Sequence, residues 1–416
     1  MWKSSGSSYL KMVLVSTLVL GLLVGSFAIT ASGAKKITIG SLMSLTGGLA
    51  KYGPPISNGA KLAVRDINKA GGVLGKELEI IVRDTQSERG PARDAASKLV
   101  NLDQVSVIIG ALSSGSTIAV NTVTSSKDVV LISPSSTSAA IKDLQDDDYT
   151  YRTCLGDSYQ GVVQGRLAKN LGYKRVAVIF VNNAYGKGLM EIFQKNFEEL
   201  GGEVVARVPY KVGLPSYGGE ASKAVNANPD VISIIGYPTG GNKLLQKTIE
   251  LGYEGEYIFS DGMKGEGVAP GPTCALDAKP AEQYISGSFG TAPSFGAADE
   301  FEEDFKAAYG PSAVPFRAQA YDATVVAALA MQMAGETTGP AIKANLRKVA
   351  NAPGEKVGYG ELEKALKLAK EGKDINWQGV SSAVEFDENG DMASGTIVLW
   401  AVQKCQSKNL WYIDIK

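Results

Sequence analysis

Apolar residues form two patterns along the chain. Some form short continuous runs, and others recur at helical spacing over longer stretches. Positions 105–111 and 175–181 are short apolar runs, whereas 58–70 places Leu62, Ala63 and Ile67 on one face of a helix. The pattern predicts strands at 37–42, 78–83, 105–111, 129–133, 175–181, 203–210, 230–236 and 256–260. It predicts helices at 58–70, 91–100, 117–126, 158–171, 184–200, 219–227, 240–251, 298–309, 316–335 and 340–351. Further strands are expected at 383–391, 396–402 and 410–415.

The order of these elements is strand, helix, strand, repeated with few interruptions. Consecutive strands with a helix between them are typical of a doubly wound parallel sheet with right-handed crossovers. The repeat starts again after Thr153, so the sequence predicts an α/β fold with two doubly wound units. The helices beyond residue 298 are expected to cover the first sheet, after the chain has crossed back to it.

Two strands of the first unit run into loops that are rich in hydroxyl residues. Ser113, Ser114 and Ser116 follow the strand at 105–111, and the loop at 134–138 follows the strand at 129–133. A helix is expected after each loop, and the free N–H groups at a helix N-terminus can bind an anion such as a carboxylate. Both loops are expected at one edge of the sheet, where open α/β sheets bind ligands. The alternative is that these serines only cap the helices.

Composition narrows the class of protein. The 416-residue chain carries 42 basic and 43 acidic side chains and has no Lys/Arg-rich run, which argues against nucleic acid as a partner. It has no histidine, so it cannot form a Ser-His-Asp or Cys-His catalytic system or a His-ligated zinc site. Because paired-carboxylate and P-loop motifs are also missing, we expect no enzyme activity, no cofactor and no metal. The stretch 387–391 is a partial calcium-loop pattern, but its residues are more typical of a turn.

The N-terminus has the features of a secretory signal. Two lysines precede the apolar run 12–29 and small residues follow it, with cleavage expected after Ala31 or Ala34. We therefore expect residues 1–34 to be a signal peptide and the protein to be periplasmic or otherwise extracytoplasmic; an uncleaved membrane anchor is the alternative. An exported protein with three cysteines can hold one disulfide. The sequence leaves its pairing open among Cys154, Cys274 and Cys405.

Short motifs follow one another in a family-specific order. They are 47–53 (GGLAKYG), 58–60 (NGA), 67–72 (INKAGG), 109–114 (IGALSS), 133–137 (SPSST), 185–188 (YGKG), 236–237 (GY) and 260–262 (SDG). The chain resembles the leucine/isoleucine/valine-binding family of periplasmic solute-binding proteins, the type I substrate-binding subunits of ABC transporters. The resemblance covers nearly all of the chain after the signal segment. It implies a Venus flytrap, in which two lobes joined by a three-strand hinge close over a ligand. The expected lobes are 35–154 with 290–380, and 155–289 with 381–416.

The resemblance implies four ligand-binding residues in the first lobe. Ser114 and Thr137 match the positions that hold the ligand carboxylate, and Ser135 matches a position whose backbone lies near the ammonium group. Tyr52 matches an aromatic residue at the mouth of the pocket. The consecutive hydroxyl residues Ser135 and Ser136 are expected to make the pocket more polar than alanines would.

Three further residues match the second lobe of the family. Asp261 lies where the family places an acid for the ammonium group, and Tyr185 and Tyr237 match aromatic residues that close over the ligand. A buried zwitterion needs donors for its carboxylate and an acceptor for its ammonium, and this set supplies both. Asp261 replaces the longer Glu of the branched-chain amino-acid members, which leaves the identity of the ligand open.

The family implies a non-catalytic receptor for an amino acid, branched-chain or related, that delivers its ligand to an ABC permease. We expect a monomer whose partners are this small-molecule ligand and the permease. Two alternatives stay open. One is a ligand sensor, because regulators and receptors share the fold, and the other is a member that binds an amide, urea or an aromatic acid. Asp261 favours a ligand with an α-amino group.

Overall fold

The computed structural model describes residues 36–264, 275–276, 279–280, 285–294, 298–403 and 406–415, all within one compact unit, Lys36–Lys416. The expected signal peptide, Cys274 and Cys405 lie outside the described residues. Cys154 is a buried free thiol, so the pairing of the other two cysteines stays open. Among the described helices, none is both long enough and apolar enough to cross a membrane.

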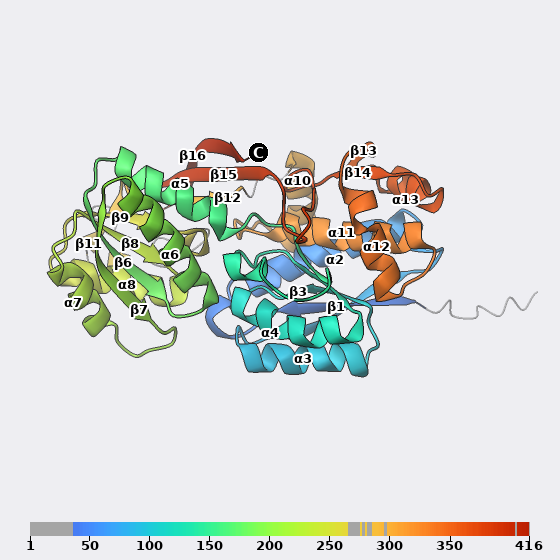
Figure 1. Ribbon diagram of the computed structural model, residues 1–416, viewed down its shortest axis with the longest axis horizontal. Coiled ribbons are helices and arrows are strands. Elements are labelled where there is room, and N and C mark those ends of the chain that lie inside the picture. Colours follow the sequence, from blue (N-terminus) through green and yellow to red (C-terminus); the bar gives the residue numbers. More distant parts are fainter. Residues whose placement is uncertain are drawn as a thin grey trace, which may run out of the picture. The chain divides into compact units, whose positions relative to one another are not determined.

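The first sheet has five parallel strands in the order β2-β1-β3-β4-β5. Successive side chains point to opposite faces, so Ile39 and Met43 of β1 pack into one hydrophobic cluster and Leu42 packs into another. Helices α3 and α4 cover the Leu42 face, while α2 and α11 cover the other (Figure 1). The strands are β1 (Ile37–Met43), β2 (Leu78–Asp84), β3 (Val107–Gly110), β4 (Val130–Ser133) and β5 (Thr150–Arg152). The helices are α2 (Gly53–Lys69), α3 (Arg89–Asn101), α4 (Ser114–Thr124) and α11 (Arg317–Ala334).

Further helices pack on the outside of α2 and α11. These are α10 (Asp299–Tyr309), α12 (Gly339–Ala350) and α13 (Leu362–Lys370). A small parallel sheet of β13 (Glu355–Gly358) and β14 (Ile375–Gln378) flanks them. Of the helices beyond residue 298, α11 and α12 contact strands of the first sheet, as predicted, whereas α10 and α13 pack on α2 or α11.

The second sheet has seven strands in the order β16-β15-β12-β9-β8-β6-β7. The strands from β12 to β7 are parallel, while β15 pairs antiparallel with β12 and with β16. Helix α5 packs against α6, and α7 packs against α8. The strands are β6 (Arg175–Val181), β7 (Glu203–Tyr210), β8 (Val231–Ile235), β9 (Glu256–Phe259), β12 (Phe289–Pro293), β15 (Gly395–Gln403) and β16 (Gln406–Ile415). The helices are α5 (Asp157–Asn170), α6 (Ala184–Glu199), α7 (Gly218–Asn226) and α8 (Pro238–Glu250).

The chain passes between the two sheets three times, after β5, after β12 and after β14. Two lobes built on parallel sheets confirm the predicted fold class, and the structure adds an antiparallel pair at one edge of the second sheet. The residue limits of the lobes stay a prediction. The limit expected between 289 and 290 falls inside β12, whose partners are β9 and β15.

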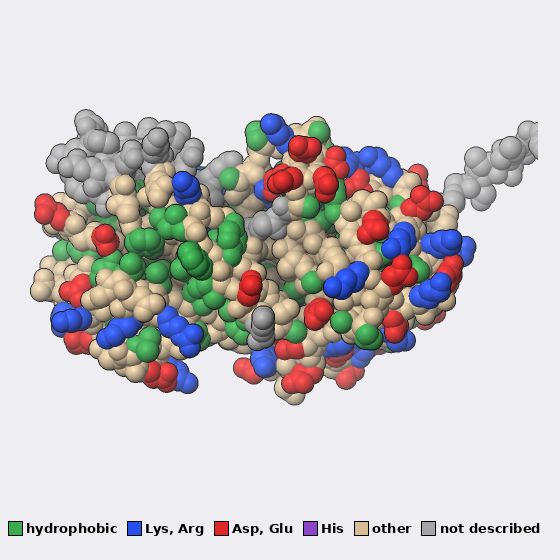
Figure 2. All heavy atoms as spheres, turned by 90° about the horizontal axis from the view of Figure 1, so that it is seen from above, with side chains coloured by type: hydrophobic (Ala, Val, Ile, Leu, Met, Phe, Trp, Pro, Cys, Tyr) green, Lys and Arg blue, Asp and Glu red, His purple; other side chains and the backbone are tan. Residues whose placement is uncertain are grey.

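Strand β16 forms an exposed edge of the second sheet. In Figure 2 hydrophobic side chains gather on the part of the surface that belongs to the second sheet, whereas acidic and basic side chains are interspersed over the other part. Three successive residues of β16, Leu410, Trp411 and Tyr412, are exposed. The inner strands β6 and β8 are buried on both faces, and this burial is lost at the edge strand.

Several boundaries near the carboxyl ends of the first sheet differ from the prediction. Helix α2 begins at Gly53 and not at residue 58, because the two prolines that follow fit a first turn, where no intrahelical N–H is needed. Helix α4 begins at Ser114 and not at residue 117. The loop after β4 leads into a single 3-10 turn, Ala139–Ile141, so the helix expected there is wrong.

Other elements differ farther along the chain. The sequence did not predict β5, β12, β13, α13 and β14. The strand expected at 383–391 is wrong, because this segment makes only isolated bridges at Ala383 and Phe386. The stretch 387–391 is the expected turn, in which Asp387 Oδ1 accepts two backbone N–H groups at 2.8 and 3.0 Å.

Candidate ligand-binding site

Ser114 lies in the first turn of α4, where the chain leaves β3. The N-cap is Ser113, whose Oγ accepts the N–H of Ser116 at 3.3 Å and donates to Ser116 Oγ at 2.7 Å. These two serines therefore cap the helix. The hydroxyl of Ser114 remains beside the free N–H groups of the first turn and accepts the N–H of Ser138 at 3.2 Å. Ser113 and Ser116 thus cap the helix, whereas Ser114 belongs to the predicted anion site in the same loop.

The loop after β4 lies against the loop after β3. Ser135 Oγ donates to the carbonyl of Leu112 at 3.0 Å, which ties the two loops together. Thr137 is buried and lines the same cavity as Ser114 and Ser135. The hydroxyl of Ser136 instead lies 2.7 Å from Thr117 Oγ1 inside the lobe. The expectation that Ser136 makes the pocket more polar is therefore wrong, because this side chain points into the lobe.

Tyr185, Tyr237 and Asp261 come together at the carboxyl ends of β6, β8 and β9. Tyr185 is in the first turn of α6, Tyr237 is the N-cap residue of α8, and Asp261 begins a 3-10 turn after β9. The hydroxyl of Tyr185 donates to Asp261 Oδ1 at 2.6 Å, and its ring stacks on Tyr237 with centroids 5.7 Å apart. Gly262 follows because a Cβ there would lie 2.4 Å from the carbonyl oxygen of Gly236.

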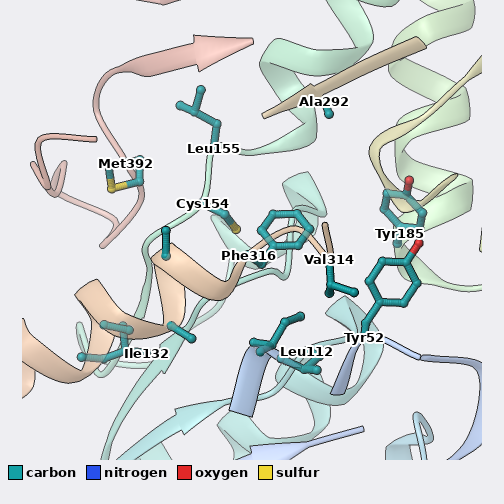
Figure 3. Packing of buried hydrophobic residues seen from close by; sticks show 14 of the residues in the cluster. Tyr52, Leu112, Ile132, Cys154, Leu155, Tyr185, Ala292, Val314, Phe316 and Met392 are labelled. Carbon is teal, nitrogen blue, oxygen red and sulfur yellow. The ribbon is translucent and has the colours of Figure 1, made fainter. Parts of the chain in front are cut away.

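Hydrogen bonds connect the two lobes around these residues. The hydroxyl of Tyr52 donates to the carbonyl of Gly262 at 2.9 Å, and Ser138 Oγ donates to the carbonyl of Ala184 at 3.1 Å. Figure 3 shows the Tyr52 ring, from the first lobe, beside Tyr185, from the second. The two lobes are therefore in contact across the site.

All seven residues predicted for ligand binding line one cavity between the lobes. They are Tyr52, Ser114, Ser135, Thr137, Tyr185, Tyr237 and Asp261. The structure brings them together, while their contacts with a ligand stay a prediction. The remaining lining residues, which the sequence analysis missed, are Leu49, Ile56, Leu112, Gly262 and Phe316. In Figure 3, Leu112 and Phe316 both lie to the left of Tyr52 and Tyr185.

Burial sets the protonation of the polar groups that line the cavity. It raises the pKa of Tyr52, Tyr185 and Tyr237, so all three hydroxyls stay protonated and can donate. Burial also raises the pKa of Asp261, and the hydrogen bond from Tyr185 acts in the opposite direction. The cavity thus offers hydroxyl and N–H donors on one side, a carboxylate on the other and apolar walls between them. This arrangement suits a small zwitterion with an apolar side chain.

A cavity lined by residues of two parallel-sheet lobes is typical of a two-lobed small-molecule-binding protein. The sequence model of the family described as "Periplasmic binding protein" matches residues 36–362. The chain belongs to this family, as a type I periplasmic binding protein, and the resemblance to it is confirmed.

Three curated relatives illustrate the family. The chain is 25% identical over 370 residues to a chemotactic signal transduction system substrate-binding protein, BasB, of Halobacterium salinarum, covering 87% of the chain and 86% of the relative. It is 32% identical over 244 residues to the Leu/Ile/Val-binding protein BraC3 of Rhizobium johnstonii, covering 58% and 65%. It is 28% identical over 358 residues to a leucine-, isoleucine-, valine-, threonine- and alanine-binding protein of Pseudomonas aeruginosa, covering 83% and 92%.

Two solved structures show the same fold. A leucine binding protein, LivK, of Thermotoga maritima superposes with a TM-score of 0.75 at 26% identity, covering 91% of this chain and 98% of that chain. A solute binding protein of Rhodopseudomonas palustris in complex with 3,4-dihydroxybenzoic acid superposes with a TM-score of 0.72 at 19% identity, covering 91% and 97%. The fold is therefore shared by proteins with chemically different ligands.

Proposed function

We propose that the protein is the extracytoplasmic substrate-binding subunit of an ABC importer, and that it captures an amino acid between its lobes and delivers it to a permease. The observation that carries this proposal is the opposed chemistry of the cavity. Ser114 and the N-terminus of α4 lie on one side and Asp261 lies on the other. A carboxylate bound at the helix N-terminus leaves the ammonium group of the same ligand to pair with Asp261.

The walls of the cavity indicate the kind of side chain that the ligand carries. Leu49, Ile56, Leu112 and Phe316 are apolar and buried, or nearly so. An aliphatic or aromatic side chain gains about 25 cal/mol for each Å² of apolar surface that such walls remove from water. A charged side chain would instead lose its hydration there without a partner. The names of the Pseudomonas aeruginosa and Rhizobium johnstonii relatives agree with branched-chain amino acids as ligands.

The transport role rests on the family and on the N-terminus. Members of this family are periplasmic solute-binding proteins and not enzymes, and the apolar run 12–29 is the expected export signal. We propose that the exported protein is a monomer that docks on a permease in the cytoplasmic membrane.

A sensing role is the second candidate. The observation that favours it is the relative BasB, which is named as part of a chemotactic signal transduction system and matches over most of both chains. Capture of a ligand by lobe closure serves both roles, so binding data alone do not separate them. Uptake of labelled ligand by cells that carry the gene, compared with cells in which it is deleted, supports transport if it is lost on deletion and sensing if it is unchanged.

The first test is thermal unfolding of the mature protein against a ligand panel, after unfolding and refolding to remove bound ligand. The panel contains α-amino acids, their deaminated analogues, amides, urea and aromatic carboxylates. A ligand that binds only the folded protein adds about 2.7 kcal/mol of stability at a hundredfold excess over its Kd, which is a clear rise in Tm. We expect apolar α-amino acids to raise the Tm. A rise with aromatic carboxylates or amides alone would contradict the proposed ligand class.

A further inference from the structure

The first passage between the lobes begins at a buried arginine that belongs to none of the predicted motifs. Arg152 is the last residue of β5, is 1% exposed and is followed by the short segment 153–156, which leads into α5. Its guanidinium group donates to both carboxylate oxygens of Asp391, at 2.5 and 2.6 Å. A buried arginine is tolerated when its charge and its donors are paired, and this bidentate contact pairs them. The side chain therefore has a fixed position where the chain leaves the first lobe.

Asp391 lies on the third passage, which runs from the end of β14 to the start of β15. The turn that precedes it packs on β5, because the N–H of Arg152 donates to the carbonyl of Gly390 at 3.0 Å. Gly390 has a φ of +73°, and a Cβ there would lie 2.4 Å from the carbonyl oxygen of Thr150, so only glycine allows this approach. The ion pair and the turn thus fasten the first and third passages to each other.

The same guanidinium group holds the loop that carries Thr137, one of the residues predicted to bind the ligand carboxylate. It donates to the carbonyls of Ser136 and Ser138, at 3.1 and 2.8 Å. At the other end of the first passage, Asp157 is the buried first residue of α5, and its N–H donates to the carbonyl of Thr137 at 2.7 Å. Three consecutive carbonyls of this loop are therefore bonded to the two ends of the first passage.

The segment 136–138 also faces the cavity and the second lobe. Thr137 lines the cavity. The N–H of Ser138 donates to Ser114 Oγ at 3.2 Å, and Ser138 Oγ donates to the carbonyl of Ala184, in the second lobe, at 3.1 Å. One short segment thus contacts the hinge, the ligand cavity and the opposite lobe.

The geometry of a guanidinium group allows it to transmit orientation. Its five N–H donors lie in one rigid plane, so the direction in which the Asp391 carboxylate holds one edge fixes the direction of the donors on the other edge. A rotation of the third passage that turns this carboxylate therefore also turns the N–H groups that the carbonyls of 136–138 accept. A lysine ammonium group is a point charge on a flexible stem and does not couple the two contacts in this way.

We propose that Arg152 is a positioning residue that couples bending of the hinge to the ligand-binding segment 136–138, and that its pair with Asp391 sets the orientation of the coupling. The inference rests on the proposed function and names residues through which lobe closure and ligand capture depend on each other. Neither residue is among the described residues that line the cavity. Both therefore act on the ligand through the backbone of 136–138.

The test uses Arg152→Lys, which keeps a positive charge beside Asp391 but cannot donate to the carboxylate and to both carbonyls at once. The Kd of the α-amino acid that gives the largest thermal shift is measured by titration calorimetry. We expect it to rise about tenfold or more, because hydrogen bonds from a charged group to the loop are lost. Asp391→Asn should also raise the Kd. The double variant should show no larger rise than Arg152→Lys alone, because the two residues act through one pair.

Asp148→Asn is the matched control, because it breaks another bidentate pair that holds the third passage. Arg347 donates to the two oxygens of Asp148 at 2.7 and 2.9 Å, and to the carbonyl of Asp387 at 3.0 and 2.7 Å. Among the hydrogen bonds of the described residues, none joins this pair to the segment 136–138. We expect Asp148→Asn to lower the unfolding temperature of the ligand-free protein and to leave the Kd unchanged.

A purely structural role gives a different result. If Arg152→Lys lowers the unfolding temperature but keeps the wild-type Kd, or if Asp148→Asn raises the Kd as much, the inference is overturned. Additive effects of the Arg152 and Asp391 variants on the Kd would also overturn it. If Arg152→Lys does not fold, the Kd of Asp391→Asn decides between the same two results. A wild-type protein that binds no α-amino acid contradicts the proposed function, and the variants are then titrated with the panel ligand that does bind.

Discussion

At the scale of single residues, buried charge dominates the behaviour of this site. Asp157 and Asp261 are enclosed by protein, and burial is the largest cause of the raised pKa of each. The charge of Asp261 raises the pKa of Asp157 further, while Thr137 and Arg152 act in the opposite direction. An empty site therefore tends to hold a proton that an arriving ammonium group displaces.

The sign of the pH dependence follows from the raised pKa of Asp157. A carboxyl whose pKa is higher in the folded protein than in the unfolded chain stabilises the fold below its unfolded pKa, and this contribution is lost as pH rises through the folded pKa. Asp157→Asn cannot ionise at this position, so its stability lacks this pH-dependent contribution. We therefore expect the unfolding temperature of the variant to exceed that of wild type at pH 8, and the difference to decrease as the pH is lowered towards the ordinary pKa of an aspartate.

The measurement is thermal unfolding of both ligand-free proteins from pH 5 to pH 8, followed by circular dichroism. The difference between the two proteins reports the titration of Asp157 together with its coupling to Asp261. A difference that stays constant with pH would show that Asp157 does not titrate in this range. The raised pKa of Asp261 predicts that the affinity for an amino acid falls as the pH decreases, because the protonated carboxyl no longer attracts the ammonium.

At the scale of elements, neighbouring serines at the start of α4 have different roles. Ser113 caps the helix, and Ser114 lines the cavity. Ser113→Ala removes the N-cap and should lower the free energy of unfolding by about 1 kcal/mol, as measured by denaturant titration of the ligand-free protein. Ser114→Ala keeps the cap but removes a hydroxyl from the cavity. A hydrogen bond to a charged group contributes about 1.5–3 kcal/mol, so the affinity for an amino acid should fall about tenfold or more.

Each of the two serine variants serves as the experimental control for the other. If Ser113→Ala reduced ligand affinity as much as Ser114→Ala, the loop would act as one capping unit, and the separate role of Ser114 would be wrong. If Ser114→Ala left the affinity unchanged, the carboxylate would not bind at the start of α4.

The sequence predicted the order of elements well where local pattern decides it. The run that became β6 is almost continuously apolar, and the helix α6 is long, periodic and followed by two glycines. Prediction failed where long-range contacts decide. Strand β12 has an undistinguished sequence, Phe-Gly-Thr-Ala-Pro, and is a strand because β9 and β15 pair with it from both sides.

In the candidate site, too, local motifs could be predicted and long-range contacts could not. The seven predicted residues came from motifs that the family shares, and the structure brings them to one cavity. Phe316 and Leu112 reach it through loop geometry that no periodicity encodes, although Phe316 lies at the predicted start of a helix. Asp157 also begins a helix, where an acid is expected for the helix dipole alone. Its complete burial distinguishes it from an ordinary first-turn acid.

At the scale of the whole molecule, we expect ligand affinity to depend on an equilibrium between separated lobes and lobes in contact, as the hinged fold implies. The apparent Kd equals the intrinsic Kd divided by the fraction of protein in the binding-competent state. The hydroxyl of Tyr52 stabilises contact between the lobes because it donates to the carbonyl of Gly262 at 2.9 Å and to that of Lys264 at 3.3 Å. It therefore contributes to affinity even if it does not touch the ligand.

Tyr52→Phe removes this hydroxyl and keeps the ring that lines the cavity. Loss of the hydrogen bond should cost about 0.5–1.5 kcal/mol, which is about a twofold to twelvefold rise in Kd by titration calorimetry. The control is Tyr217→Phe, because Tyr217 donates to the carbonyl of Lys211 at 3.0 Å within the second lobe. It should lower the unfolding temperature and leave the Kd unchanged. Small-angle scattering should show that saturating ligand still reduces the radius of gyration of Tyr52→Phe. Equal changes of Kd in both variants would mean that loss of any buried tyrosine hydroxyl weakens binding, and that the contact between Tyr52 and Gly262 has no particular role in closure.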